Sequence, residues 1–341
     1  MARPSAMMHL GFDLGGTKIE AVALNQAGQV LSRRRLPTPQ DPDPDKQVQA
    51  IGQTLRALKQ VVLKESANAA GGGIARSFTM GLGTPGSVSP ASGLLRNSNT
   101  TCLNGVLLQS WAERVLEGPV VIENDANCFA LAEARQGAGR GFPIVFGVIM
   151  GTGCGAGVVI NGRIHAGRNR LAGEWGHVSI DPLGPFCWCG QRGCLETFLS
   201  GSGLQKAFFD ATGLQWSAKQ ILELTPSKNS PVSAAVVRHV LDLQNRFLWA
   251  FGEGLRRVCT ILDPDIVVLG GGLSAHPALC QNGPLQVRDQ IFGGEFDTPI
   301  VVNKLGDSAG VLGAAWLGAR KTLDLRGHAH GEREPEYPAS G

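Results

Sequence analysis

A strand, a glycine turn containing a threonine, and a second strand occur twice in this chain, which limits the folds open to it. The first copy runs through 9–36 with Gly15-Gly16-Thr17-Lys18 as its turn. The second begins at Ile144, has Gly151-Thr152-Gly153 as its turn, and continues through an Asn161-Gly162 turn into another strand. Tight glycine turns between short apolar strands are typical of β-meanders. The duplication predicts two related α/β lobes that face each other across a cleft.

The remaining segments alternate between helix and strand patterns, as in an α/β protein. Val48, Ile51 and Leu55 follow helical spacing and predict an amphipathic helix. Helices are expected at 46–64, 126–136, 232–262 and 308–321, and further strands at 78–82, 120–122, 265–269 and 299–303. We expect a small lobe from 1–124 plus 305–323, a large lobe from 125–304, and a flexible tail at 324–341.

Charge and hydropathy argue against two classes of partner. Lys and Arg total 31 against 28 Asp and Glu, a net charge of +3, and the basic run Arg33–Arg35 is short enough to be the solvated face of a strand. Nucleic-acid binding needs a clustered basic patch. No apolar stretch approaches the roughly 18 residues of a membrane-spanning helix, and the N-terminus lacks a signal-peptide core. We expect a cytoplasmic protein with no nucleic-acid or membrane partner.

Glycine is frequent, at 47 of 341 residues, and three glycine-rich turns each follow a predicted strand. Turns without side chains let backbone N–H groups surround an anion such as a phosphate. Taken singly, each turn is also typical of a tight hairpin, but three together favour a phosphate site. Thr17 and Thr152 add hydroxyl groups, Asp13 is placed to hold a metal-bound water, and Lys18 does not complete a Walker A motif. The three turns are Asp13-Leu-Gly15-Gly16-Thr17-Lys18, Gly151-Thr152-Gly153 and Gly270-Gly271-Gly272.

A cluster of metal-ligand residues follows the second turn. His177, Cys187, Cys189 and Cys194 have the spacing His-x9-Cys-x-Cys-x4-Cys, separated by loop-forming Gly and Pro. One imidazole and three thiolates suit tetrahedral Zn²⁺, and a full set of four indicates a structural site. The alternative is a group of unpaired buried cysteines, which we assign to the other five. Glu174 and Glu196 flank the cluster and become candidate contacts to a hydroxylated ligand.

Asn124-Asp125 lies where a predicted strand meets a predicted helix. Asn and Asp are preferred helix N-caps, so capping alone explains the pair. A carboxylate at the end of a strand in a cleft is equally well placed to take a proton from an attacking hydroxyl. The two roles are compatible.

Taken together, these motifs resemble the ROK family, which includes repressors and sugar kinases. The resemblance spans about 9–320 and adds Glu123-Asn-Asp-Ala-Asn127, Glu174-Trp-Gly-His177 and Cys187-Trp-Cys-Gly-Gln-Arg-Gly-Cys-Leu-Glu196 to the glycine turns. It implies a two-lobe, actin-like (ribonuclease-H-like) ATPase fold and ATP-dependent phosphorylation of a hexose. The repressors carry a helix-turn-helix domain ahead of the first strand, for which we expect no room in the eight residues before His9.

The resemblance also implies residue roles. Asp125 would be the general base, Asn124, Glu174, His177 and Glu196 would contact the sugar, and His177 with the three cysteines would bind zinc. Gly15, Gly16, Thr17, Lys18 and 151–153 would hold the phosphates of ATP·Mg²⁺, with 270–272 near adenosine. The family habit implies a homodimer. Similarity favours D-fructose as the sugar, with the N-acetylglucosamine kinases as nearest alternative and the glucokinases behind.

Overall fold

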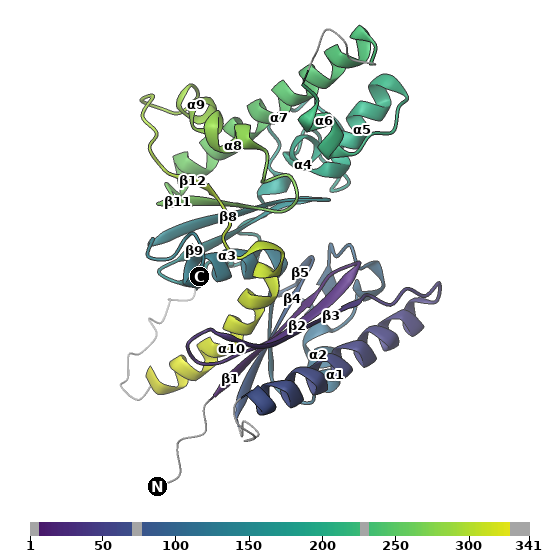
Figure 1. Cartoon of the computed structure of the whole chain (residues 1–341), viewed down its shortest axis with the longest axis vertical. Coiled ribbons are helices and arrows are strands. Elements are labelled where there is room, and N and C mark those ends of the chain that lie inside the picture. Colours follow the sequence, from purple (N-terminus) through teal and green to yellow (C-terminus); the bar gives the residue numbers. More distant parts are fainter. Residues whose placement is uncertain (1–6, 70–76, 226–231, 328–341) are drawn as a thin grey trace, which may run out of the picture.

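The computed structural model describes residues 7–69, 77–225 and 232–327 and contains two five-stranded sheets, one above the other (Figure 1). The first sheet has the order β3-β2-β1-β4-β7. Its hairpin strands pair antiparallel, whereas β1–β4 and β4–β7 are parallel. Its strands are β1 (Met8–Leu14), β2 (Lys18–Leu24), β3 (Val30–Pro37), β4 (Phe78–Thr84) and β7 (Val120–Asn124).

The second sheet repeats this plan with the order β10-β9-β8-β11-β12: its first two neighbouring pairs are antiparallel and its last two are parallel. The duplicated meander predicted from the glycine turns is therefore confirmed, and the mixed α/β architecture with it. Its strands are β8 (Ile144–Met150), β9 (Cys154–Ile160), β10 (Arg163–Ile164), β11 (Ile266–Gly270) and β12 (Ile300–Val302).

Successive side chains along a strand point to opposite faces of the sheet, so the sequence of each strand determines which helix packs on which face. In β1, Leu10, Phe12 and Leu14 are fully buried in the core that α1 (Pro44–Ala69) and α2 (Leu108–Leu116) complete. Gly11 lies between them in sequence and faces α10 (Ala309–Gly327) on the other side. On the second sheet, the long α7 (Ala234–Ile261) belongs to the core of the outer face.

Two helices, α10 and α3 (Asp125–Gln136), lie between the sheets (Figure 1). α3 packs on β8 and β9, α10 packs on β1 and β4, and the two helices pack on each other. Glycine makes this close contact feasible: a Cβ at Gly81 would lie 1.9 Å from the carbonyl oxygen of Ala314, and one at Gly313 would lie 1.8 Å from that of Cys128. The backbones therefore touch without an intervening layer of side chains.

The shorter helices α4, α5, α6, α8 and α9 lie in the upper part of the molecule, above the second sheet (Figure 1). The β5–β6 hairpin and η1 follow β4, η2 and α4–α6 lie between β10 and α7, and α8, α9 and η3 connect β11, β12 and α10. They are β5 (Ser87–Val88), β6 (Leu95–Arg96), η1 (Thr101–Leu103), η2 (Trp175–His177), α4 (Glu196–Leu199), α5 (Gly201–Thr212), α6 (Ala218–Glu223), α8 (Pro277–Gln281), α9 (Gly283–Arg288) and η3 (Gly306–Ser308).

One boundary differs from the sequence prediction. The flexible tail expected from 324 begins too early, because α10 continues as helix to Gly327. Leu323, Leu325 and Arg326 are good helix formers, and no glycine or proline interrupts the chain before Gly327. The remainder of the expected tail lies outside the described residues. Among the described helices, none is both long and apolar enough to cross a membrane.

Candidate active site

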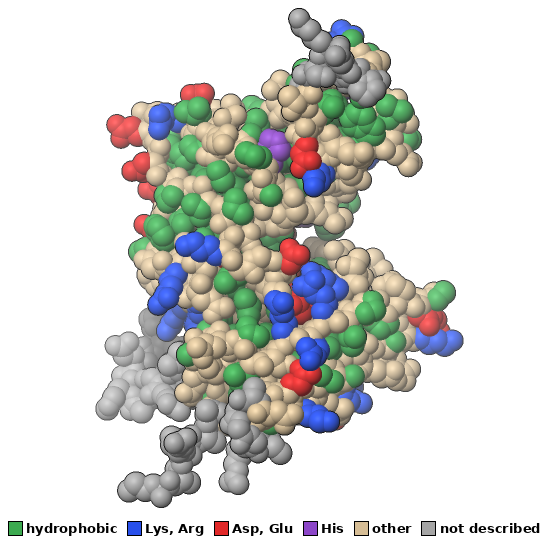
Figure 2. Space-filling view, in the orientation of Figure 1, with side chains coloured by type: hydrophobic (Ala, Val, Ile, Leu, Met, Phe, Trp, Pro, Cys, Tyr) green, Lys and Arg blue, Asp and Glu red, His purple; other side chains and the backbone are tan. Residues whose placement is uncertain are grey.

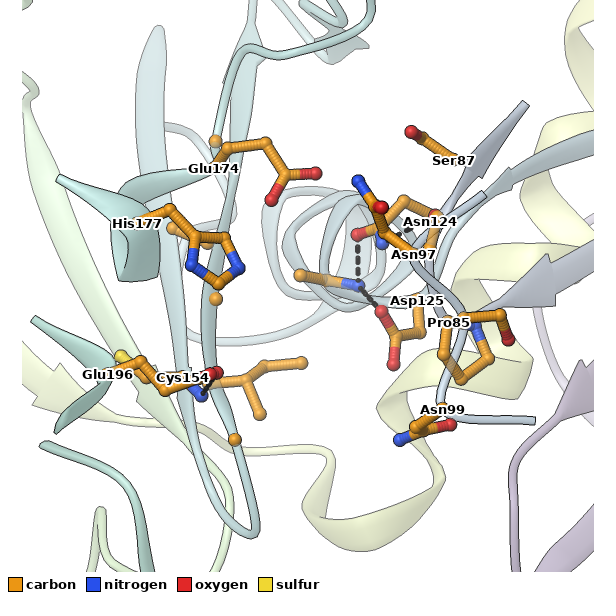
Figure 3. A pocket seen from close by; sticks show the side chains of 18 of the residues that line it. Pro85, Ser87, Asn97, Asn99, Asn124, Asp125, Cys154, Glu174, His177 and Glu196 are labelled. Carbon is orange, nitrogen blue, oxygen red and sulfur yellow. Dashed lines mark hydrogen bonds between the residues drawn. The ribbon is translucent and has the colours of Figure 1, made fainter. Parts of the chain in front are cut away.

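A cavity of about 800 Å³ opens between the sheets and is lined from both sides. The space-filling view shows the outline of the molecule notched between its upper and lower halves (Figure 2). In the close-up, Glu174, His177 and Glu196 stand on one side and Asn124 and Asp125 on the other (Figure 3). All five sequence-predicted base and sugar residues therefore meet in one cavity, although they span 73 positions of the chain from 124 to 196.

Asn124 is the N-cap of α3. Its backbone is extended, with φ −64° and ψ 147°, and its Oδ1 accepts from Ala126 N at 2.9 Å and from Asn127 N at 3.4 Å. Its Nδ2 donates to the carbonyl oxygen of Gly86 at 3.0 Å. Of the Asn124-Asp125 pair, Asn124 is therefore the residue that caps the helix. The Asp125 side chain lies at the cavity wall.

Asp125 begins α3 at the C-terminal edge of the first sheet. Its Oδ1 accepts from Ala126 N at 2.9 Å. Burial raises the pKa of its carboxyl above the ordinary value, and the hydrogen bond from Ala126 opposes that rise. A carboxylate whose charged form is destabilised in this way is a stronger proton acceptor than a solvated one.

The opposite wall belongs to the second sheet and its loops. Burial raises the pKa of Glu174, the electrostatic effect of the neighbouring His177 lowers it, and the negative charge of Asp125 raises it. Glu196 begins α4, and both of its oxygens are engaged: Oε2 accepts from Cys154 N at 3.0 Å, and Oε1 accepts from Trp188 Nε1 at 2.5 Å. These two hydrogen bonds fix the Glu196 carboxylate on the cavity wall.

His177, Cys187, Cys189 and Cys194 converge as their spacing predicts: their ligand atoms all lie within 4.8 Å of one another. Cys189 Sγ lies 3.5 Å from Cys194 Sγ, and His177 Nδ1 lies 3.6 Å from Cys187 Sγ. The three cysteines are free thiols. The edges of a tetrahedron with Zn–S bonds of about 2.3 Å are about 3.8 Å, so the observed separations fit a zinc-sized ion.

The glycine turns differ in their relation to the cavity. Gly151, Thr152 and Gly153 line it, whereas neither the 13–18 turn nor 270–272 does. The first turn lies next to it: a Cβ at Gly16 would be 3.5 Å from Oδ1 of the cavity residue Asn99. Gly271, with φ +85°, packs directly on the backbone of Met150, just before the second turn.

Asp13 is the titratable group of the first turn. Burial, followed by the negative charges of Asp125 and Glu20, raises its pKa to about 7. Lys18 and Arg35 act in the opposite direction. The effect of the Asp125 charge on the pKa of Asp13 indicates that the candidate base lies within electrostatic range of the first glycine turn.

Sequence reasoning missed several cavity residues. Asn97 and Asn99 come from the loop after β6, and Arg170 comes from the loop after β10. Arg170 has φ +54° and pairs with Glu123 at 3.5 Å, which joins the second sheet's loop to the end of β7. No periodic pattern or motif marks these positions. Trp188 is different, because it lies inside the cysteine motif.

The family assignment follows from comparisons with known proteins. The ROK family model matches residues 9–321. The N-acetyl-D-glucosamine kinase of Photobacterium profundum is 35% identical over 324 residues, which cover 92% of this chain and all of the relative.

Two solved structures are similar over the same length. The ROK hexokinase of Thermus thermophilus has a TM-score of 0.78 and 30% identity, with coverage of 93% of this chain and all of that one. A ROK family glucokinase from Streptomyces griseus, in complex with glucose and AMPPNP, has a TM-score of 0.68 and 28% identity over 92% of this chain and 99% of its own. The chain therefore belongs to the ROK family, as one of its sugar kinases.

Proposed function

We propose that the chain transfers the γ-phosphoryl group of ATP to a hydroxyl of N-acetyl-D-glucosamine, with Asp125 as general base. The observation that carries the proposal is the cavity in which the partly buried carboxylate of Asp125, at the start of α3, faces Glu174, His177 and Glu196. Such a set of acceptors and donors suits a ligand with several hydroxyl groups. The name of the Photobacterium profundum relative favours N-acetyl-D-glucosamine over the D-fructose expected from sequence similarity.

The proposed step is an in-line displacement. Asp125 takes the proton of the sugar hydroxyl while its oxygen forms a bond to the γ-phosphorus, and the bond from that phosphorus to the β,γ-bridging oxygen breaks to release ADP. Within the second turn the N–H of Gly151 is bonded to the carbonyl oxygen of Gly153, so the backbone N–H groups of Thr152 and Gly153 beside the cavity would be the ones to bind the transferred phosphoryl group. Mg²⁺ bound to ATP would neutralise charge on the phosphates, with Asp13 as the nearby carboxylate that could hold one of its waters.

Zinc fits the His177–Cys194 cluster by donor type and spacing. With all four ligands supplied by the protein, the ion would brace the loop rather than take part in the chemistry. Because His177 belongs to both the cluster and the cavity wall, the braced loop would hold the sugar-facing side of the site in place.

The test is ADP release, measured with a coupled assay on N-acetyl-D-glucosamine, D-fructose, D-mannose and D-glucose. We expect the highest kcat/KM with N-acetyl-D-glucosamine. A higher value for D-fructose would overturn the choice of sugar but not the kinase. Absence of turnover with every sugar would overturn the proposed function.

A further inference from the structure

Trp188 has an environment that its position in the cysteine motif does not explain. Its side chain is 64% exposed, yet it lines the cavity beside Glu196 and His177. An indole ring is one of the largest apolar surfaces that a residue can carry, and leaving it in water forgoes the free energy of burying it. An exposed tryptophan on a cavity wall is therefore poised to be covered by a ligand.

The polar edge of Trp188 is fully used. Its Nε1–H donates to Oε1 of Glu196 at 2.5 Å, while Cys154 N–H holds Oε2 from the other side at 3.0 Å. With one fixed donor on each oxygen, the carboxylate cannot rotate without losing a hydrogen bond. Each oxygen keeps a second lone pair for an incoming hydroxyl. Trp188 thus orients Glu196 without occupying it.

The ring also contacts the second sugar-facing side chain. The ring centroids of Trp188 and His177 lie 4.9 Å apart, with the planes at 89° in an edge-to-face arrangement. Cys187 and Cys189, both in the thiol cluster, fix the backbone on either side of the tryptophan. One residue therefore connects the cysteine loop to two of the polar groups on this wall.

We propose that Trp188 is a positioning and specificity-determining residue of the sugar site: its indole N–H aims the Glu196 carboxylate, and its exposed ring forms the outer wall that a bound pyranose covers. The inference rests on the proposed function, since it requires that a sugar occupy this cavity. It concerns recognition of the sugar and leaves ATP binding unchanged.

The loop offers a matched control. Phe186 is as exposed as Trp188, at 69%, and lies two residues away, but it packs on the guanidinium of Arg192 and does not line the cavity. We would compare Trp188→Phe, which keeps an aromatic ring and removes the donor, with Trp188→Ala and Phe186→Ala. Sugar binding without ATP is measured by calorimetry, and kcat and KM for sugar and ATP by the ADP-release assay. Thermal melting and zinc content report on the loop.

We expect Trp188→Phe to raise the sugar Kd and KM about 10-fold, the effect of losing one hydrogen bond to a charged group. Trp188→Ala should raise them about 50-fold, since it also removes the apolar wall. The KM for ATP, the zinc content and all values for Phe186→Ala should stay within about 2-fold.

Three results would overturn the inference. In the first, the Trp188 variants match Phe186→Ala in sugar affinity while the wild type phosphorylates a hexose, so only the inference falls. In the second, the Trp188 variants lose zinc or raise the KM for ATP as much as that for sugar, so the residue is merely structural. In the third, no sugar binds the wild type, and the proposed function falls together with the inference.

Discussion

At the scale of single residues, the site depends on carboxyl groups placed where their charge is unfavourable. Asp125 and Asp13 are both partly buried at the C-terminal edge of the first sheet, and the charge of Asp125 adds to the cost of ionising Asp13. Glu174 belongs to the same cluster from the opposite wall. A protein that keeps such groups gives up folding free energy, and strongly perturbed acids in a cavity are typical of functional sites. Two of these carboxyl groups can be tested by substitution, one through catalysis and one through stability.

The first measurement concerns Asp125, the proposed base. Replacing Asp125 with Asn keeps the shape of the side chain and removes the proton acceptor, so kcat should fall at least about 1,000-fold. The sugar Kd should change only a few-fold. Burial raises the pKa of Asp125 above 3.8. In the wild type, log kcat/KM should therefore fall as the pH drops below this raised pKa, where the carboxyl becomes protonated. Steady-state kinetics between about pH 5 and 9 measures the kcat of the variant and the pH dependence of the wild type.

Asp210→Asn is the control for that variant, since Asp210 is an exposed acid paired with Lys206 at 2.8 Å. Its kinetics should match the wild type. Near-normal kcat in Asp125→Asn would remove the residue from the role of base.

The second measurement concerns Asp13 and stability. Its carboxyl has a pKa of about 7 in the folded protein against about 3.8 unfolded, so the folded state binds more protons between these values. The stabilisation present below about pH 4 is therefore lost as pH rises toward 7. Asp13→Asn, neutral at every pH, should stabilise the protein by up to about 4 kcal/mol at about pH 8 and by progressively less toward about pH 5. Urea unfolding across this range measures it, and a pH-independent difference would contradict the pKa assignment.

At the scale of elements, the cysteine loop and the caps determine where the side chains point. The loop from Cys187 to Cys194 carries three of the four cluster residues and leads directly into Glu196. One loop supplies both the cluster and part of the cavity wall. A substitution at one of its cysteines should therefore also displace the side chains at the proposed sugar site.

Cys189→Ser tests this coupling. Metal analysis should give about one zinc per chain in the wild type and nearly none in the variant, since the set of four is broken. The melting temperature should fall, and kcat/KM for the sugar should drop about 10-fold or more through the displaced wall. Cys280→Ser, a free cysteine away from the cluster, is the control and should keep both zinc and activity. A zinc-free wild type would refute the zinc site.

The sequence predicted elements with a regular period well and loop contacts poorly. The helix expected at 126–136 forms at Asp125–Gln136, and the turns at 15–17 and 151–153 each lie between two strands as expected, because both depend on local pattern. The Glu123–Arg170 pair joins residues 47 positions apart, and its geometry depends on a left-handed backbone at a non-glycine residue. The bond from Trp188 to Glu196 likewise exists only once the cysteine loop has closed.

At the scale of the whole molecule, two sheets of the same order meet through α3 and α10, and the cavity opens where they diverge. Local pattern could predict the repeat but not this junction, which depends on residues as distant as Gly81 and Ala314. The resemblance implied a homodimer, and that remains a prediction for sedimentation analysis.

The close approach at the junction can be tested with one methyl group. In Gly81→Ala the new Cβ would lie 1.9 Å from the carbonyl oxygen of Ala314, so α10 must move off the sheet. We expect a loss of about 3 kcal/mol, at the upper end of overpacking effects. Gly272→Ala, with nothing within 4 Å of the added Cβ, is the stability control. Equal unfolding free energies for the two variants would show that the junction tolerates a side chain.

The cap at Asn124 has a consequence for the direction of proton flow. Both lone pairs of its Oδ1 are committed to the backbone of α3, one N–H is committed to Gly86, and a side-chain hydrogen bond from Asn124 lowers the pKa of Asp125 against the rise caused by burial. A sugar hydroxyl bound beside Asn124 would therefore find no free lone pair on its amide oxygen and could not donate to it. The hydrogen of that hydroxyl would then need another acceptor, and the neighbouring carboxylate is Asp125. In the proposed reaction the helix cap would thereby set the direction of the hydrogen bond made by the reacting hydroxyl before ATP binds.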